Sequence, residues 1–258
     1  MHVIKGFFIA ISTYSKLPVG GFEWKEEDMR YALIFFPWVG ALTGLLCAGW
    51  HLLCDRAGIG SICEVLVMTA IPLLITGGIH VDGYMDTMDA VHVYGTYEKR
   101  REILSDPHIG AFSVIMLMLY GLIFVGALAE VIQRNALPAV YACFYFSRVL
   151  SGLSVLWFPK AKEGGMLFTF CSGAAKKITT VCLILQGLFC IVFWLWEAPL
   201  TGGAAALAGL IVMGWYYRFS RDKFGGVSGD TAGFFLLMEE LFMILAICVV
   251  SVTLTYCK

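Results

Sequence analysis

The chain has 258 residues, of which 59% are hydrophobic and only 14% are charged, and its mean hydropathy is +0.81. Soluble domains usually carry about 25% charged residues, so the composition excludes an ordinary soluble domain and predicts a polytopic membrane protein. The net charge of −1 gives no basic field for nucleic acid, which we therefore do not expect as a partner.

The apolar stretches along the chain predict the number of membrane spans. A spanning helix needs roughly 20 mostly apolar residues. Residues 1–22 are too short and too mixed to span, and they suit an interfacial or re-entrant segment. No domain boundary or internal repeat is visible, so we expect one integral-membrane domain over residues 1–258, an all-α bundle of about seven transmembrane helices in the lipid bilayer. The predicted spans are about 32–53, 62–79, 110–133, 136–158, 178–196, 198–217 and 233–256.

The basic residues predict the orientation of these spans. Of the 18 lysines and arginines, 14 fall in the N-terminal segment and in the loops after the second, fourth and sixth spans, whereas three fall on the other side. The positive-inside rule then predicts a multi-pass protein of the inner (cytoplasmic) membrane. Its N-terminus and its long polar loops, which carry the candidate catalytic residues, are expected to face the cytoplasm.

Three aspartates, Asp82, Asp86 and Asp89, follow the second span, with no lysine or arginine from 77 to 98. On a helix, this spacing places all three within an arc of about 60°, where like charges repel by roughly 0.2–0.5 kcal/mol per pair. A bound cation would offset that repulsion. Mg²⁺ takes one or two carboxylates and keeps water or substrate phosphates for its other positions. The spacing predicts a magnesium site; the alternative is a solvated acidic loop.

A glycine-rich turn, Phe224 to Gly233, precedes the last span. Successive amides at Gly225, Gly226 and Gly229 can form an anion-binding nest next to a helix N-terminus, and Asp230 could add a metal ligand. A simple break between two helices is the alternative. The predicted topology places this turn on the same side of the membrane as the aspartates.

Charged residues also occur inside the apolar stretches. Arg148 lies near the middle of the fourth stretch, so we expect it to face the bundle interior and to pair with an acid or a phosphate. Glu239 and Glu240 lie in the last stretch, either as functional acids or as structural partners of Arg148. Asp106 precedes Pro107, an arrangement typical of a helix N-cap.

The motifs resemble those of the cobalamin synthase family, also called adenosylcobinamide-GDP ribazoletransferase. The run from His80 to Asp89 is similar to the family pattern HLDGLADTADG, and the segment from Asp106 to Phe112 is similar to its DSRIGAF. The block GGVSGD at 225–230 resembles GGVTGD, and Lys16 to Val19 resembles RLPV. The matches follow the family order over most of the chain. Pro107-His108 replaces a Ser-Arg-type pair, which removes any role of that arginine.

The resemblance implies the last step of cobalamin biosynthesis. In that step α-ribazole, or its 5′-phosphate, is joined to adenosylcobinamide-GDP, and adenosylcobalamin, or its 5′-phosphate, and GMP are formed. Family members use Mg²⁺. Carried onto this sequence, the catalytic residues are Asp82, Asp86, Asp89 and Asp106, of which the first three are the metal ligands. The substrate-binding residues are His80, Arg148, Gly225, Gly226, Gly229 and Asp230.

Two other functions fit some of the same residues. Intramembrane acids and glycine-interrupted helices also suit a cation-coupled transporter, although no internal repeat supports one. A membrane phosphatidyltransferase acting on a lipid-linked diphosphate would use the same acidic chemistry. The sequence leaves open whether the chain forms a homo-oligomer.

Overall fold

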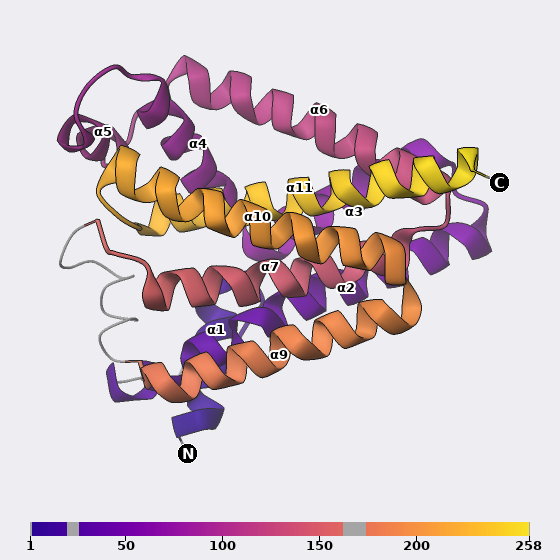
Figure 1. Cartoon of the computed structure of the whole chain (residues 1–258), viewed down its shortest axis with the longest axis horizontal. Coiled ribbons are helices and arrows are strands. Elements are labelled where there is room, and N and C mark those ends of the chain that lie inside the picture. The colour runs from indigo at the N-terminus through magenta and orange to yellow at the C-terminus, as the bar shows by residue number, and fades with distance from the viewer. Residues whose placement is uncertain (1, 20–25, 162–173, 258) are drawn as a thin grey trace.

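The computed structural model describes residues 2–19, 26–161 and 174–257, and it confirms the all-α helix bundle (Figure 1). Within these ranges the only β feature is one isolated bridge, between Lys160 and Val227. A short 3-10 helix, Glu26–Tyr31, leads into α2. The α-helices are α1 (His2–Tyr14), α2 (Ala32–Ala57), α3 (Ser61–Thr76), α4 (Ile79–His92), α5 (Tyr97–Leu104), α6 (Ala111–Gln133), α7 (Leu137–Trp157), α9 (Lys176–Glu197), α10 (Pro199–Phe224) and α11 (Gly229–Tyr256).

Six described helices are long and apolar enough to cross a membrane: residues 27–57, α6, α7, α9, α10 and α11. The second predicted span differs from the prediction. It ends at Thr76 after 16 residues, and the chain then bends by 94° into α4. The bent pair α3 and α4 forms either a broken span or a re-entrant loop, so the described residues hold six spans, or seven if the pair is one span. The described part of the N-terminal segment, residues 2–19, contains the 13-residue helix α1, which is too short to span, as predicted.

Small residues allow the helices to approach closely. A Cβ atom at Gly40 would lie 2.0 Å from the carbonyl oxygen of Phe144, and one at Gly44 would lie 2.3 Å from that of Tyr141. Helix α2 therefore packs directly on the backbone of α7, as small residues permit in membrane bundles. Gly202 of α10 lies close to the side chain of Trp194 of α9, whose Cβ would be 2.4 Å from a Cβ atom at residue 202.

Large apolar side chains cover the outside of the bundle. Helix α9 alone exposes Leu185, Phe189, Val192 and Trp196, each by more than half of its surface. A continuous apolar surface of this kind marks contact with a membrane rather than with water, which agrees with the composition.

Figure 1 shows how the ends of the helices are distributed. Helix α5, the turn between α10 and α11, the end of α7 and the start of α9 all lie at one end of the bundle, and the C-terminus lies at the other. The three predicted basic loops therefore gather at one end, which we call the basic end. Lys25 and Lys162, two of the basic residues, lie outside the described residues. The functional motifs approach one another at this same end.

Candidate active site

A tight corner between α3 and α4 sets the direction of the aspartate helix. Gly77 and Gly78 both have positive φ values, 63° and 81°, which glycine adopts without the steric cost that other residues have. The N–H of Lys16 donates to the carbonyl of Ile75 at 2.8 Å, and the Lys16 side chain packs over Gly77. The segment after α1 thus holds the corner from which α4 begins.

Helix α4 crosses the start of α11 at very short range. A Cβ atom at Gly83 would lie 2.6 Å from the carbonyl oxygen of Asp230, and one at Gly233 would lie 3.1 Å from that of His80. Two glycines, one on each helix, therefore bring the two helix backbones into contact. This crossing joins the aspartate motif to the GGVSGD motif, although the two are far apart in the sequence.

The crossing gathers acidic side chains on one face. Asp82 is exposed, while Asp86, Asp89 and Asp230 are half-buried. The charges of Asp82, Asp230 and Asp89 all act on Asp86. We call these four residues the acidic cluster. Sequence reasoning grouped the first three by helical spacing and placed Asp230 only on the same side of the membrane.

Both carboxylate oxygens of Asp89 accept hydrogen bonds from the backbone. Oδ2 accepts a hydrogen bond from the N–H of Gly110 at 2.7 Å, and Oδ1 accepts one from the N–H of Ser113 at 2.9 Å. Gly110 is the N-cap residue of α6 and has no side chain of its own to cap the helix. The carboxylate of Asp89 therefore satisfies the free amides at the start of α6 and complements the helix dipole.

The chemistry of the acidic cluster suits a divalent cation that is completed by substrate. Among the described residues, no three His, Cys, Asp or Glu side chains converge closely enough to form a full ion site. Mg²⁺ requires no such cage, since it binds through one or two carboxylates together with substrate phosphates and water. Asp82 and Asp86 on α4 and Asp230 on α11 are the carboxylates that could hold it.

The glycine turn does not offer the predicted anion-binding nest. The N–H groups of Gly225, Gly226 and Val227 donate to the carbonyls of Arg221, Ser220 and Pro159, and the N–H of Ser228 donates to the Thr231 hydroxyl. A Cβ atom at Gly226 would lie 2.5 Å from the backbone of Lys160. These glycines end α10 and admit a neighbouring chain segment, so their amides are used within the protein. Gly229 and Asp230, one step later, line a cavity beside the acidic cluster.

The arrangement of Asp106 before Pro107 is typical of a helix N-cap, but Asp106 does not cap the following helix. Helix α6 begins only at Ala111, and its N-cap residue is Gly110. Asp106 lies in the exposed loop after α5 and accepts hydrogen bonds from the backbone N–H of His108 at 3.0 Å and from its ring at 2.6 Å. These hydrogen bonds hold the pKa of Asp106 below its usual value. The Asp106 carboxylate therefore stabilises the turn of its own loop through hydrogen bonds to His108.

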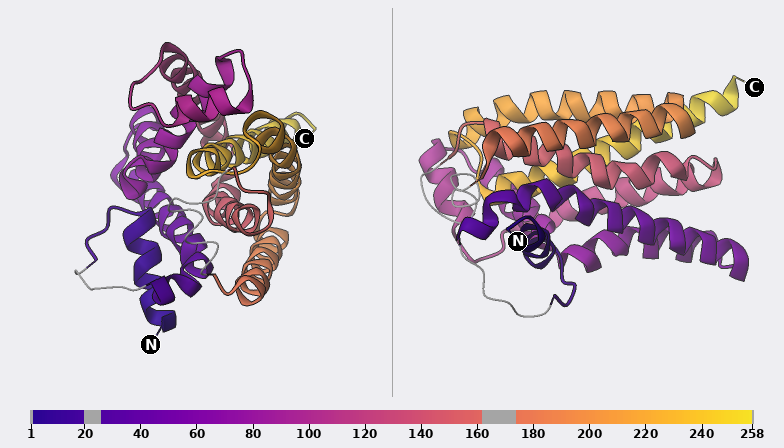
Figure 2. Two further views of the ribbon diagram at one scale, coloured as in Figure 1. Left: turned by 90° about the vertical axis from the view of Figure 1, so that its left-hand side faces the viewer. Right: turned by 90° about the horizontal axis from the view of Figure 1, so that it is seen from below.

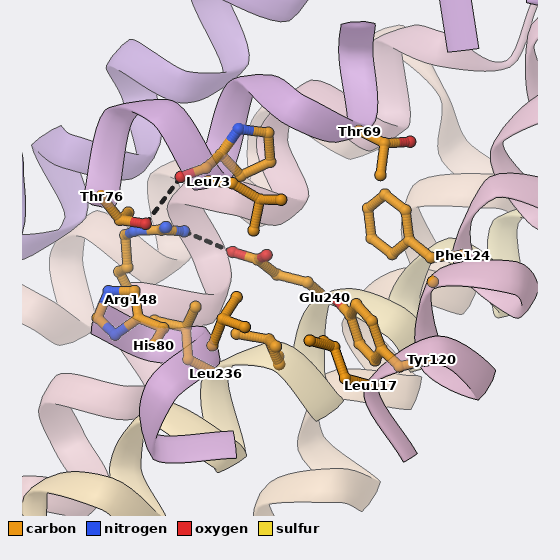
Figure 3. A pocket seen from close by; sticks show the side chains of 14 residues that line it. Thr69, Leu73, Thr76, His80, Leu117, Tyr120, Phe124, Arg148, Leu236 and Glu240 are labelled. Carbon is orange, nitrogen blue, oxygen red and sulfur yellow. Dashed lines mark hydrogen bonds and ion pairs between the residues drawn. The ribbon is translucent and has the colours of Figure 1, made fainter. Parts of the chain in front are cut away.

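Arg148 lies deep in the bundle, where it pairs with an acid (Figure 3). Its Nη1 donates to Oε1 of Glu240 at 2.6 Å and to the carbonyl of Phe144 at 2.7 Å. Ser147 also donates to Glu240, at 3.3 Å. Of the two partners that the sequence left open for Arg148, the structure provides the acid. Glu239, the neighbouring acid, is fully buried, and neither of its oxygens has a hydrogen-bond partner among the described residues.

His80 lies between two cavities. One is the cavity of Figure 3, of about 240 Å³, which also contains Arg148 and Glu240. The other, of about 260 Å³, also contains Asp82 and Asp230. The side chain is 8% exposed, and its Nε2 atom has no hydrogen-bond partner among the described residues.

Two features of the site were not foreseen. Tyr14 and Thr13, at the end of α1, line the cavity next to the acidic cluster, and the resemblance of Lys16–Val19 to a family motif was the only signal in that region. Arg101 of α5 donates from Nε to the carbonyl of Phe224 at 2.7 Å and so ties α5 to the end of α10. No spacing rule could have paired these two residues.

The fold and the site define a class: an integral-membrane enzyme whose acidic cluster lies at one end of a helix bundle. The family model described as cobalamin-5-phosphate synthase matches residues 6–248. The chain therefore belongs to the cobalamin-5-phosphate synthase family.

Curated relatives agree with this assignment. A protein of Lachnoclostridium phytofermentans is 36% identical over 99% of this chain and 98% of its own length. Another, from Clostridium botulinum, is 27% identical over 96% and 98%, and one from Chlorobium phaeobacteroides is 31% identical over 89% and 92%. All three are named adenosylcobinamide-GDP ribazoletransferase. No solved structure matches the chain. These matches favour a transferase over the alternative of a cation-coupled transporter.

Proposed function

We propose that this chain catalyses the Mg²⁺-dependent joining of α-ribazole, or its 5′-phosphate, to adenosylcobinamide-GDP. The products are adenosylcobalamin, or its 5′-phosphate, and GMP. The names of the relatives support the substrates. The structural observation that carries the proposal is the convergence of the aspartate motif on α4 with Asp230 at the start of α11.

The reaction requires positioning and charge neutralisation more than covalent catalysis. A ribose hydroxyl oxygen attacks the phosphorus that carries cobinamide, and the bond from that phosphorus to the oxygen of GMP breaks. The hydroxyl proton passes to a carboxylate of the acidic cluster, and GMP leaves with the bond electrons. Because the 5′-phosphate of α-ribazole also serves as a substrate in this proposal, the attacking hydroxyl is not the one at the 5′ position.

Each acid of the cluster has a part in this scheme. Asp82 and Asp86, together with Asp230, would hold Mg²⁺, which when bound neutralises the pyrophosphate and stabilises the departing GMP. Asp89 holds the start of α6 beside the cluster through its two hydrogen bonds.

The orientation in the membrane belongs to the same proposal. The acidic cluster, α5 and the turn between α10 and α11 share the basic end of the bundle. The positive-inside rule places that end in the cytoplasm, so we propose a protein of the cytoplasmic membrane that receives both substrates from the cytoplasmic side.

The direct test is incubation of membranes containing the chain with adenosylcobinamide-GDP, α-ribazole and Mg²⁺. The expected result is GMP and adenosylcobalamin in equal amounts, inhibition by EDTA and recovery when Mg²⁺ is added in excess. Membranes without the chain serve as the control. Formation of GMP without consumption of α-ribazole would instead indicate hydrolysis, and turnover that resists EDTA would remove the metal from the scheme.

A further inference from the structure

A cavity of about 260 Å³ lies directly beside the acidic cluster. Five helices contribute to it: α1, α2, α4, α7 and α11. Most of its wall is apolar, including Leu33, Phe36 and Val155, whereas Asp82 and Asp230 line it where it meets the cluster. Nothing in the scheme above uses this cavity, so its occupant is an open question.

The polar group that most needs a partner in this wall is His80. More than nine-tenths of its side chain is buried, and Nε2 has no hydrogen-bond partner among the described residues. A buried polar atom without a partner costs free energy, and such atoms in native proteins commonly await a ligand or water. The His80 ring lies 6.0 Å from that of Phe36, which in turn lies 4.4 Å from that of Tyr14. The cavity thus combines aromatic walls with the His80 ring, whose Nε2 atom is enclosed by protein atoms and has no partner among the described residues.

Size and charge narrow the choice of occupant. Pockets for whole drug-sized ligands measure roughly 300–1,000 Å³, so this cavity accepts one ring system and not a nucleotide or a corrin. The carboxylates on its rim disfavour a phosphate inside it. A purine would bring several polar groups, each of which needs a buried partner. A flat aromatic base with a single free ring nitrogen matches both the walls and His80.

On the basis of the function proposed above, we propose that this cavity binds the aromatic base of the nucleoside co-substrate, and that a rotation of the His80 ring, which borders the cavity, brings the enclosed Nε2 atom into a hydrogen bond with the free ring nitrogen of the base. The base of α-ribazole is a benzimidazole, which is planar and has one such nitrogen. Asp82 and Asp230 line the same cavity, so a base held there directs its ribose to the acidic cluster. The attacking hydroxyl then reaches the pyrophosphate without a separate ribose site.

Binding of α-ribazole to the purified full-length chain, without adenosylcobinamide-GDP, tests this assignment independently of turnover. His80→Phe keeps a ring but removes the nitrogen. We expect it to weaken α-ribazole binding and to raise the KM for α-ribazole by about tenfold or more, with little change in the KM for adenosylcobinamide-GDP. An indole riboside, in which C–H replaces the free ring nitrogen, should bind the wild type more weakly than α-ribazole does, and His80→Phe should bind both equally.

A second variant keeps the proposal testable if the replacement of the buried His80 prevents folding. Thr13, which is half-buried, lines the cavity from α1, so Thr13→Trp should fill it and raise the KM for α-ribazole. Its exposed neighbour Ser12 does not line the cavity, and Ser12→Trp should leave this KM unchanged.

The outcomes separate the two proposals. Equal binding of the two ribosides by the wild type, or a rise in the KM for adenosylcobinamide-GDP in place of that for α-ribazole, would overturn the base pocket and leave the proposed function intact. His80-dependent binding of α-ribazole without any release of GMP would overturn the proposed function and leave the base pocket standing.

Discussion

Gly83 of α4 lies against the backbone of Asp230 at the start of α11, so closely that a Cβ atom at residue 83 would come within 2.6 Å of the carbonyl oxygen of Asp230. Real Cβ atoms do not make such contacts with backbone, and the oxygen belongs to a helix that cannot move alone. This contact is what brings the aspartate motif and the GGVSGD motif into one site.

Gly83→Ala should therefore separate α4 from α11 and displace Asp82 and Asp86 relative to Asp230. A displacement of about 1 Å at a catalytic site can cost roughly 10²-fold in rate, so we expect a loss of that order in the rate of GMP release. Gly126 of α6 is the matched control, because a Cβ atom there would meet nothing within 4 Å. Full activity of Gly83→Ala would show that the crossing does not set the geometry of the site.

Variants of Asp89 test whether this residue stabilises the start of α6 or binds the metal ion. Asp89→Ala removes both acceptors at the start of α6, so we expect a loss of about 1–2 kcal/mol in stability, with a smaller loss in Asp89→Asn, which keeps one oxygen. Thermal unfolding of the purified protein measures this loss. Unchanged unfolding together with a raised requirement for Mg²⁺ would instead support the ligand role that helical spacing first predicted.

The buried pair of Arg148 and Glu240 should be structural. Arg148→Met leaves the carboxylate of Glu240 buried without a partner, which costs about 3–5 kcal/mol, whereas replacing both charges by apolar residues is often neutral. We expect Arg148→Met to unfold at lower temperature and the double variant Arg148→Met/Glu240→Leu to recover both stability and activity. If the double variant is stable but has a raised KM for adenosylcobinamide-GDP, Arg148 contacts phosphate, as the family resemblance implies.

The predicted orientation can be tested at two exposed positions. Tyr94 is 99% exposed in the segment between α4 and α5, at the basic end, and Glu197 is exposed at the opposite end of α9. Cysteines placed there should react with a membrane-impermeant maleimide from the cytoplasmic side at Tyr94→Cys and from the outer side at Glu197→Cys. The background replaces Cys63 and Cys257, which are exposed, and Cys171, which lies outside the described residues. The reverse pattern of labelling would invert the topology.

The sequence predicted those parts of the fold that follow from local chemistry. Long apolar runs located the spanning helices, and the i, i+4, i+7 spacing placed three aspartates on one helix. The bend at Gly77 and Gly78 was missed because an apolar run continues to the corner, and only positive φ values reveal that the helix stops.

Contacts between distant segments could not be derived from spacing. The glycine turn of Gly225 and Gly226 follows the pattern of an anion-binding nest, yet its amides bond to α10 and to Pro159. The binding of Asp89 to the start of α6 and the approach of α1 to the acidic cluster likewise depend on tertiary packing. The resemblance to the family identified residues that matter, whereas the structure separates those that face the site from those that support it.

The central claim is that Asp82 and Asp86 hold a divalent ion against the diphosphate of the substrate. Mn²⁺ can replace Mg²⁺ as an oxygen-bound ion, and its binding is measured directly by electron paramagnetic resonance on the purified chain with adenosylcobinamide-GDP present. We predict that Asp82→Asn and Asp86→Asn bind Mn²⁺ at least about tenfold more weakly than the wild type, whereas Asp222→Asn, at an exposed acid outside the cluster, does not. Equal Mn²⁺ binding by the wild type and both cluster variants would contradict the account.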